Sequence, residues 1–194
     1  MTRALALRAG VVVFAAVAAW VLFFGLPRWY SARKQAAVAA AGTPAATPAG
    51  TGSAVRKITA TLFYVSEDGL TLTPAQREVA FSPNVSAQAR AIVEAQLAPA
   101  PPLVSAIPAE TKLRDVFVTE RGDAFIDLSG DIVAKHSGGS LDEILTVYTL
   151  VNALTVNLPA VRSVQILVDG KEVQTLAGHV DLRQPLAKNQ GLVQ

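Results

Sequence analysis

The chain has 194 residues, of which 51% are hydrophobic and 16% charged, and its formal net charge is +2. The length favours one domain with appendages, and the apolar excess favours membrane or secreted classes of protein. The later part of the chain has no dense basic stripe, so composition gives little support to a nucleic-acid-binding surface. Because the chain contains no cysteine, disulfides, thiolate metal sites, thiol nucleophiles and lipid-modified cysteines are excluded.

An uncharged apolar segment, residues 9–26, follows a short basic N-tail at residues 1–8. Its length fits a membrane-spanning helix, which needs about 17 to 25 apolar residues, and Trp29 and Tyr30 follow where an interfacial aromatic belt would lie. A cleaved signal peptide usually has a shorter apolar core, of roughly 7 to 15 residues, with a cleavage site close behind it. We therefore predict an uncleaved anchor over residues 9–27, with the cleaved form as the alternative.

Basic residues lie on both sides of the apolar segment, so the positive-inside rule does not decide its orientation. The short basic N-tail, and the linker and domain that follow, favour a cytoplasmic N-terminus with the later part of the chain outside the cytoplasm. Residues 28–55 form the predicted linker, and residues 36–54 contain only small, uncharged side chains and valine. Such a stretch buries too little apolar area to offset its ordering entropy, so we expect it to hold a folded domain off the bilayer.

The folded domain is predicted over residues 56–187, with a tail at residues 188–194. Residues 58–65 are rich in β-branched and aromatic side chains and predict a strand. Residues 67–69 read Glu-Asp-Gly, which is typical of a turn. Residues 76–81 predict a second, partly exposed strand.

A helix is predicted after the second strand. Ser82 offers a capping hydroxyl, and Pro83 suits the first helical position. Residues 98–111 contain several prolines, so they predict a loop. A binding groove is the alternative use of this loop; the simpler expectation is that its large apolar residues pack on the core. The apolar face of the helix comprises Val85, Ala89, Ile92, Val93 and Leu97, and the large apolar loop residues are Leu103, Val104 and Ile107.

A hairpin and a second helix are predicted next. Residues 113–119 and 124–128 are short β-type runs around a turn. Ser140 and Glu143 have the spacing of a capping box, in which each side chain satisfies a backbone N–H at the helix start. The residues behind them form an amphipathic stripe at helical spacing: Leu141, Ile144, Leu145, Tyr148, Val151 and Leu154.

The last predicted unit is another hairpin. Residues 164–168 form its first strand, Asp169-Gly170 is a strong hairpin turn signal, and residues 171–176 return beside the strand. The order of elements is strand, strand, helix, hairpin, helix, hairpin. It predicts an α+β fold, with a small mixed sheet and two helices packed on one face of that sheet.

Five sequence pieces carry a resemblance to a known family: ITATLFYVSEDGLTL, IPAETKLRDVFV, GDAFIDLSGD, LTVYTLVNAL and SVQILVDGKEVQTLAGHVDLRQPL. In this order and spacing, over residues 58 to about 186, they resemble the GerMN domain, also called the sporulation and spore-germination domain. The resemblance implies a membrane- or lipid-anchored bacterial envelope domain, a fold like the ring-building motifs of some secretion and sporulation complexes, and no established enzyme activity. This chain has one copy and no lipidation cysteine, whereas the family often has tandem copies or is a lipoprotein.

The sequence offers one candidate catalytic constellation. Ser129, Asp131 and His136 lie close in sequence, but a triad is defined by spatial geometry, and the chain has no GxSxG elbow. Backbone capping at a strand end accounts better for Asp127, Ser129 and Asp131. The two histidines, His136 and His179, lack ligand-like spacing. We therefore predict no enzyme activity and no catalytic, cofactor-binding or metal-binding residues.

The sequence thus predicts a non-catalytic, membrane-anchored bacterial envelope module that binds or assembles, linked through its resemblance to sporulation, germination or other envelope processes. The expected partner is an envelope protein or a second copy of the chain, and not nucleic acid. Candidate contact residues are Gln76 and Glu78 on an outward strand, and Arg162 near the start of another. The alternative is an accessory subunit or small-ligand sensor that acts with a cell-wall enzyme.

Overall fold

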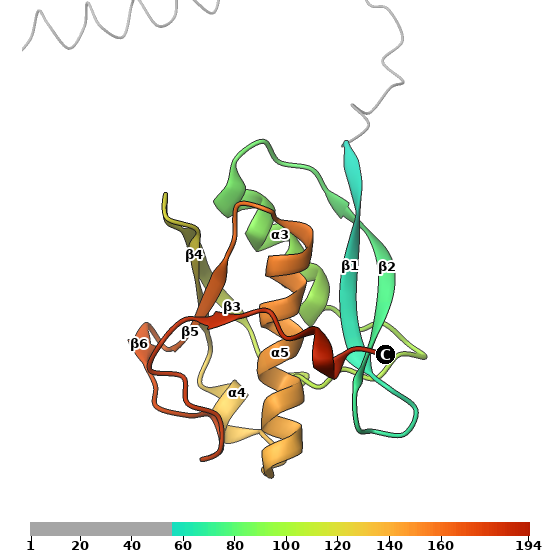
Figure 1. Ribbon diagram of the computed structural model, residues 1–194, viewed down its shortest axis with the longest axis vertical. Coiled ribbons are helices and arrows are strands. Elements are labelled where there is room, and N and C mark those ends of the chain that lie inside the picture. Colours follow the sequence, from blue (N-terminus) through green and yellow to red (C-terminus); the bar gives the residue numbers. More distant parts are fainter. Residues whose placement is uncertain (1–55) are drawn as a thin grey trace, which may run out of the picture. The chain divides into compact units, whose positions relative to one another are not determined.

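The computed structural model describes residues 56–194; the predicted N-tail, anchor and linker lie outside the described residues. Between Arg56 and Gln194 no helix combines the length and the apolar character that crossing a bilayer requires. The elements of this part, labelled as in Figure 1, are β1 (Lys57–Val65), β2 (Leu72–Ala80), α3 (Val85–Leu97), β3 (Leu113–Val118), β4 (Asp123–Leu128), α4 (Asp131–Ala134), α5 (Ser140–Asn157), β5 (Ser163–Val168), β6 (Lys171–Glu172), β7 (Leu186–Ala187) and the 3-10 helix η2 (Gln190–Leu192).

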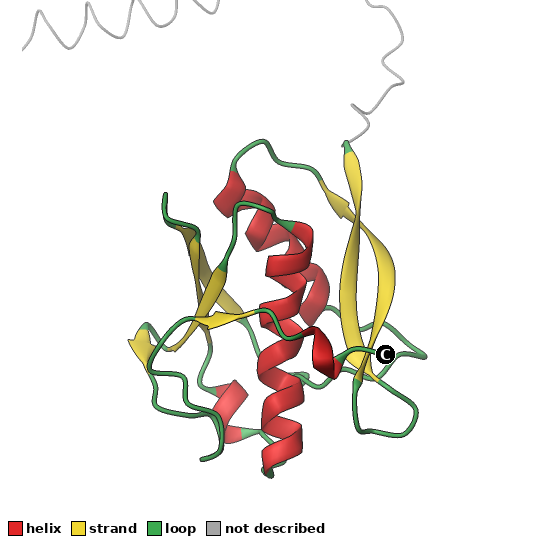
Figure 2. Cartoon of the chain, viewed as in Figure 1, coloured by secondary structure: helices red, strands yellow, loops and turns green. Residues whose placement is uncertain are grey.

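The described strands form two sheets. β1 and β2 make a separate antiparallel hairpin, while the second sheet has the order β3-β4-β5-β6, with β7 also paired to β5. The second sheet is mixed, because β4 and β5 run parallel and the other pairs run antiparallel. Helices α3 and α5 stand between the hairpin and the mixed sheet and contact both (Figures 1 and 2). The α+β class and the mixed sheet are therefore confirmed, but the expectation of a single sheet is wrong.

The burial of β1 explains why the first hairpin forms its own sheet. Leu62, Phe63 and Tyr64 are buried in succession, so both faces of β1 are covered. β2 instead exposes most of its residues and buries only Leu72 and Val79. The hairpin therefore packs against the helices mainly through β1 and leaves β2 as the outermost strand.

The start of α3 lies later than predicted. Asn84 is the N-cap, and its side-chain oxygen accepts a hydrogen bond of 2.9 Å from the backbone N–H of Ala87. Ser82 and Pro83 precede this cap. The apolar face of the helix is confirmed at Ala89, Ile92 and Val93, which are fully buried.

The predicted capping box at α5 is wrong. Gly139 is the N-cap and Ser140 the first helical residue, with no side-chain cap. Glu143 is fully buried and accepts hydrogen bonds from the backbone N–H groups of Leu176 and His179, each at 2.7 Å. Burial raises the pKa of Glu143, but hydrogen bonds from the backbone N–H groups of Leu176, Ala177, His179 and Val180 together lower it by more. The pKa of Glu143 therefore lies below its ordinary value. Glu143 thus fixes the loop after β6 instead of capping its own helix.

The core confirms part of the apolar pattern. Leu145 and Leu154 of α5 are buried, as predicted. In the loop at residues 98–111, Ile107 is buried, but Leu103 and Val104 are 38% and 62% exposed. Val104 instead accepts a hydrogen bond from the backbone N–H of Val65 at 2.8 Å, so its main chain and not its side chain joins the hairpin.

The chain end is packed on the domain. The predicted return strand after the Asp169-Gly170 turn pairs with β5 over only two residues, and β7 pairs with β5 further along. Asn189 then exchanges hydrogen bonds with the side-chain amide of Asn152, at 2.9 and 3.0 Å. Residues 188–194, expected as a tail, therefore contact α5.

Candidate interaction surface

The backbone of the β1–β2 hairpin offers two edges for further hydrogen bonding. The direction of the main-chain N–H and C=O groups alternates along a strand. Every second residue therefore directs these groups away from the paired strand. Thr61 and Gln76 are directly opposite in the register. The N–H and C=O of Thr61 point away from β2, where they bond to Asn157. By the same alternation, the N–H and C=O of Gln76 point away from β1.

Two side-chain amides close the outer edge of β1 at Thr61 and Phe63. Gln96, at the end of α3, accepts a hydrogen bond from the N–H of Phe63 at 2.9 Å and donates one to the C=O of the same residue at 2.8 Å. Asn157, at the end of α5, does the same for Thr61, with distances of 2.8 and 2.7 Å. Each amide offers an acceptor and a donor side by side, so it replaces the peptide group of a missing neighbouring strand. Gln96 is fully buried.

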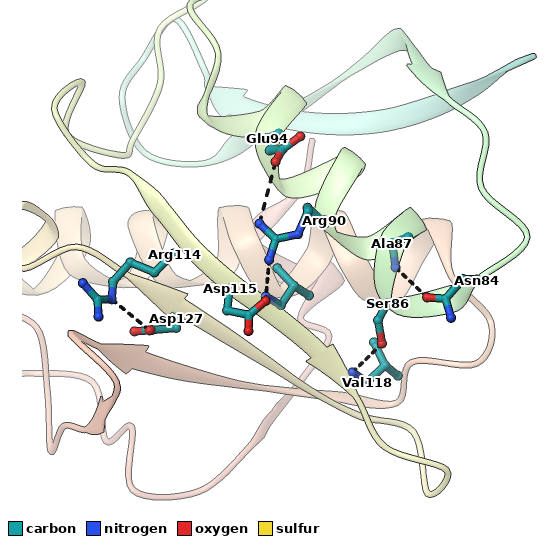
Figure 3. Close-up of polar contacts among 10 residues, drawn as sticks. Asn84, Ser86, Ala87, Arg90, Glu94, Arg114, Asp115, Val118 and Asp127 are labelled. Atoms are coloured by element: carbon teal, nitrogen blue, oxygen red, sulfur yellow. Dashed lines mark hydrogen bonds and ion pairs between the residues drawn. The ribbon is translucent and has the colours of Figure 1, made fainter. Parts of the chain in front are cut away.

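The outer edge of β3, which ends the mixed sheet, is covered by α3. Ser86 accepts a hydrogen bond of 3.0 Å from the N–H of Val118 (Figure 3). Arg90 forms an ion pair with Asp115, and the same guanidinium lies 3.8 Å from Glu94. The helix that supplies Gln96 to β1 therefore also contacts the edge of β3.

The outer edge of β2 is closed only at its two ends. The C=O of Leu72 accepts a hydrogen bond of 3.0 Å from the N–H of Gln194, and the C=O of Ala80 accepts one of 3.0 Å from the Gln88 side chain. Between them, the outward main-chain groups of Pro74, Gln76 and Glu78 bond to no residue between Arg56 and Gln194. We call this five-residue stretch, Pro74–Glu78, the open window of β2.

The side chains of Pro74, Gln76 and Glu78 in the open window are exposed, and those of Gln76 and Glu78 are polar. The Gln76 amide donates to the hydroxyl of Thr61 at 3.1 Å, and Glu78 pairs with Lys57 at 2.8 Å. The hydrogen bond from Lys57 lowers the pKa of Glu78 and, reciprocally, raises the pKa of Lys57. The charge of Glu78 is therefore balanced within its own hairpin.

Two of the three predicted contact residues share this surface. Gln76 and Glu78 lie in the open window, but Arg162 precedes β5 of the mixed sheet and is not brought together with them. Its backbone N–H donates to the C=O of Gly122 at 2.8 Å. A Cβ atom on Gly122 would lie 3.2 Å from the Arg162 Cγ, so the Arg162 stem covers the turn before β4.

Sequence reasoning missed Gln96 and Asn157. Both are polar residues at the C-terminal ends of helices, where hydrophobic periodicity gives no signal. A buried amide becomes significant only when the strand that it faces is known, because its hydrogen-bonding partners are main-chain atoms of any sequence.

The serine-type constellation does not assemble as a triad. Ser129 donates to Asp131 at 2.9 Å. The Nε2 atom of His136 lies 3.2 Å from the hydroxyl of Thr146, and its Nδ1 accepts a hydrogen bond of 2.9 Å from Gly138. Both ring nitrogens of His136 thus contact residues other than Ser129. Within residues 56–194, no three His, Asp or Glu side chains gather as a metal site would require.

Two hollows bear on the small-ligand alternative. The larger has a volume of about 310 Å³ and is lined by Thr61, Phe63, Asn152, Val156 and Val193, among others. A second, of about 240 Å³, adjoins the 98–111 loop, but Ser105, Ser137 and Asp142 contribute polar groups to its wall. This second hollow is therefore not the deep apolar cavity that a sensor at that loop would require.

Comparisons with known proteins identify the family. The model of the Germane family, described as sporulation and spore germination, matches residues 61–174. No curated protein matches the chain at a significant level. A crystal structure of a candidate lipoprotein from Clostridium perfringens is 20% identical, with a TM-score of 0.50 over 73% of this chain and 95% of that one. The tandem GerMN domains of the sporulation protein GerM from Bacillus subtilis are 16% identical, with a TM-score of 0.53 over 68% of this chain and 46% of that one. The chain belongs to the sporulation and spore germination family and carries a GerMN domain.

Proposed function

We propose that this GerMN domain is a non-catalytic binding and assembly module, held at the bacterial membrane by residues 9–27 and placed outside the cytoplasm. The observation that carries the proposal is the open window of β2. Among the strands between Arg56 and Gln194, β1 is closed from Thr61 to Val65, β3 lies against α3, β4 and β5 are interior, and β6 and β7 have two residues each. An open edge is a ready template for another strand, and proteins usually cover such edges when they are not used.

The membrane placement rests on two lines of support. The apolar segment at residues 9–26 is long enough to span a bilayer. The similar structure from Clostridium perfringens is described as a candidate lipoprotein, which is consistent with a domain held at a membrane. Carbonate washing of membranes tests this point: the full chain should stay in the pellet. Recovery of a soluble mature form beginning near Ala40 would show instead that the segment is a cleaved signal.

Photocross-linking in living membranes tests the binding role. A photoreactive residue is placed at Gln76 or Glu78 in the open window, at Arg162 on the other sheet, and at Thr47 in the linker as a control. The proposal predicts discrete, position-dependent products from the window and none from Thr47. If no position in the domain gives a specific product, the binding and assembly role is rejected.

The cavity of about 310 Å³ beside Phe63 supports a second candidate, a small-ligand sensor. Its volume is at the lower limit for small-molecule sites, which are about 300–1,000 Å³, and both apolar and amide groups line it. A small envelope molecule that binds there should protect Val156 and Val193 in a footprinting experiment. Such binding, together with an absence of window cross-links, would favour the sensor.

A further inference from the structure

The open window of β2 is symmetric about one residue. Leu72 and Ala80, which flank it, already have their carbonyls bonded by Gln194 and Gln88. Three outward-facing residues remain, and Gln76 is the middle one. Pro74 has a carbonyl but no N–H, so it accepts from a neighbouring strand without donating to it. A strand added to this window therefore needs to be only five residues long and centred on Gln76.

We propose that the occupant is the same window of a second copy, paired antiparallel about a two-fold axis at Gln76. In this register the Gln76 residues of the two copies exchange N–H···O=C hydrogen bonds. The N–H of each Glu78 donates to the Pro74 carbonyl of the other copy, which needs no N–H from proline. This inference rests on the proposed function and names its partner.

Charge disfavours the two registers that are shifted towards Glu78. With the axis at Gln76, Pro74 faces Glu78 and Ala75 faces Arg77, so no like charges are opposite. An axis at Arg77 would place two guanidinium groups opposite each other, and an axis at Glu78 would do the same for two carboxylates. Like charges directly opposite across a strand pair are destabilising. The ion pair of Lys57 with Glu78 is kept in each copy.

The short window makes the pairing weak in dilute solution. Attachment of every copy to one membrane raises the effective concentration of the windows without any new contact. The composition of residues 28–55 predicts a linker, which would let neighbouring domains reorient until their β2 edges meet. The association is therefore expected on membranes and not for the dilute, isolated domain.

Single cysteines report the register, because the natural chain has none. Opposite Cα atoms in a hydrogen-bonded antiparallel pair lie about 5.5 Å apart, within the range of about 4.4–6.8 Å that a disulfide accepts. Full-length Gln76→Cys should therefore form a disulfide dimer in membranes under a mild oxidant. Glu78→Cys should not, because the two Glu78 positions are four residues apart along the pair, or about 13 Å. Lys171→Cys, on the mixed sheet, is the surface control.

A second set of variants tests whether the main chain carries the pairing. Pro74→Cys and Glu78→Cys, expressed as two chains in one membrane, should cross-link to each other. Adding Gln76→Ala to both chains keeps the central N–H and should retain this product. Adding Gln76→Pro removes that N–H, which faces away from β1, and should abolish the product; circular dichroism checks that this variant is folded. If it is not folded, the single-cysteine pattern decides alone.

We expect the Gln76→Cys dimer to exceed those of Glu78→Cys and Lys171→Cys at least about tenfold, because only its sulfurs meet in disulfide geometry. Equal dimers at all three positions indicate random collision and overturn the inference. Absence of the Gln76→Cys dimer, alongside strong photocross-links from the window to another protein, also overturns it but leaves the proposed binding role intact. Absence of both kinds of product rejects both.

Discussion

Thr61 and Gln76 face each other across one hairpin, yet their outward main-chain groups meet opposite environments. The N–H of Thr61 donates to Asn157 at 2.8 Å, whereas that of Gln76 bonds to no residue between Arg56 and Gln194. Strand pairing cannot account for the difference, since both residues belong to the same antiparallel pair. The helices create it, because α3 and α5 end beside β1 and bring an amide to its edge.

The comparison shows how a short strand edge can be closed without another strand. One Asn or Gln side chain replaces one peptide group, because its amide has an acceptor and a donor. The domain repeats this arrangement at β1 and at the docked chain end, where Asn152 bonds both the N–H and the C=O of Asn189. No side-chain amide closes the open window of β2 in this way.

The largest expected effect is at the closed edge. Gln96→Ala leaves the N–H and C=O of buried Phe63 without partners, each of which costs about 1–3 kcal/mol, so unfolding in urea should show a loss of about 3 kcal/mol or more. Gln96→Met keeps most of the side-chain volume and separates the lost hydrogen bonds from the cavity. A loss below about 1 kcal/mol in both variants would mean that the amide does not close the edge energetically.

A smaller effect is expected at Asn157. Thr61 is only half-buried, so water can replace part of the lost bonding. Asn157→Ala should lower the free energy of unfolding by about 1–2 kcal/mol. Thermal unfolding of this variant alongside Gln96→Ala shows which of the two loses more stability. If Asn157→Ala lowers the free energy of unfolding more than Gln96→Ala does, the solvent exposure of the bonded strand residue does not determine the size of the loss.

Sequence reasoning identified what depends on local pattern. The hairpins, the buried face of α3 and the position of Gln76 and Glu78 on an exposed strand follow from periodicity and turn residues. Sequence reasoning failed where contacts between distant parts of the chain determine the structure. Glu143 has capping-box spacing, but a loop more than thirty residues later takes its carboxylate. Likewise, the separate first sheet depends on where helix ends meet β1, which no local pattern encodes.

Glu143 is a charged side chain that, like the amides at β1, bonds main-chain groups of another segment. Its folded pKa is lowered below the ordinary 4.5, so it should stabilise the domain at neutral pH. This stabilisation is present above the unfolded pKa and is lost as pH falls through the lower folded pKa. Urea unfolding across pH 3 to 7, about the range where carboxyls titrate, should therefore show a steeper acid loss for the natural chain than for Glu143→Gln. Identical pH profiles would contradict this role.

The smallest effect is expected for a polar contact that closes no backbone edge. Asp181 is exposed, and hydrogen bonds from Arg183 lower its pKa to about 2. Arg183→Ala should return that pKa towards 3.8 in an NMR titration, with no measurable change in unfolding. A clear loss of stability would show that exposed polar pairs matter as much as the buried amides.

Amide hydrogen exchange on the full chain at low concentration tests the central claim most directly. The account predicts that the N–H groups of Thr61 and Phe63 exchange at least about a hundredfold more slowly than those of Gln76 and Glu78, although all four belong to one hairpin. The result that would contradict it is equal protection of the two edges. Equal and fast exchange would show that Gln96 and Asn157 do not close β1, and equal and slow exchange would show that β2 has no open window.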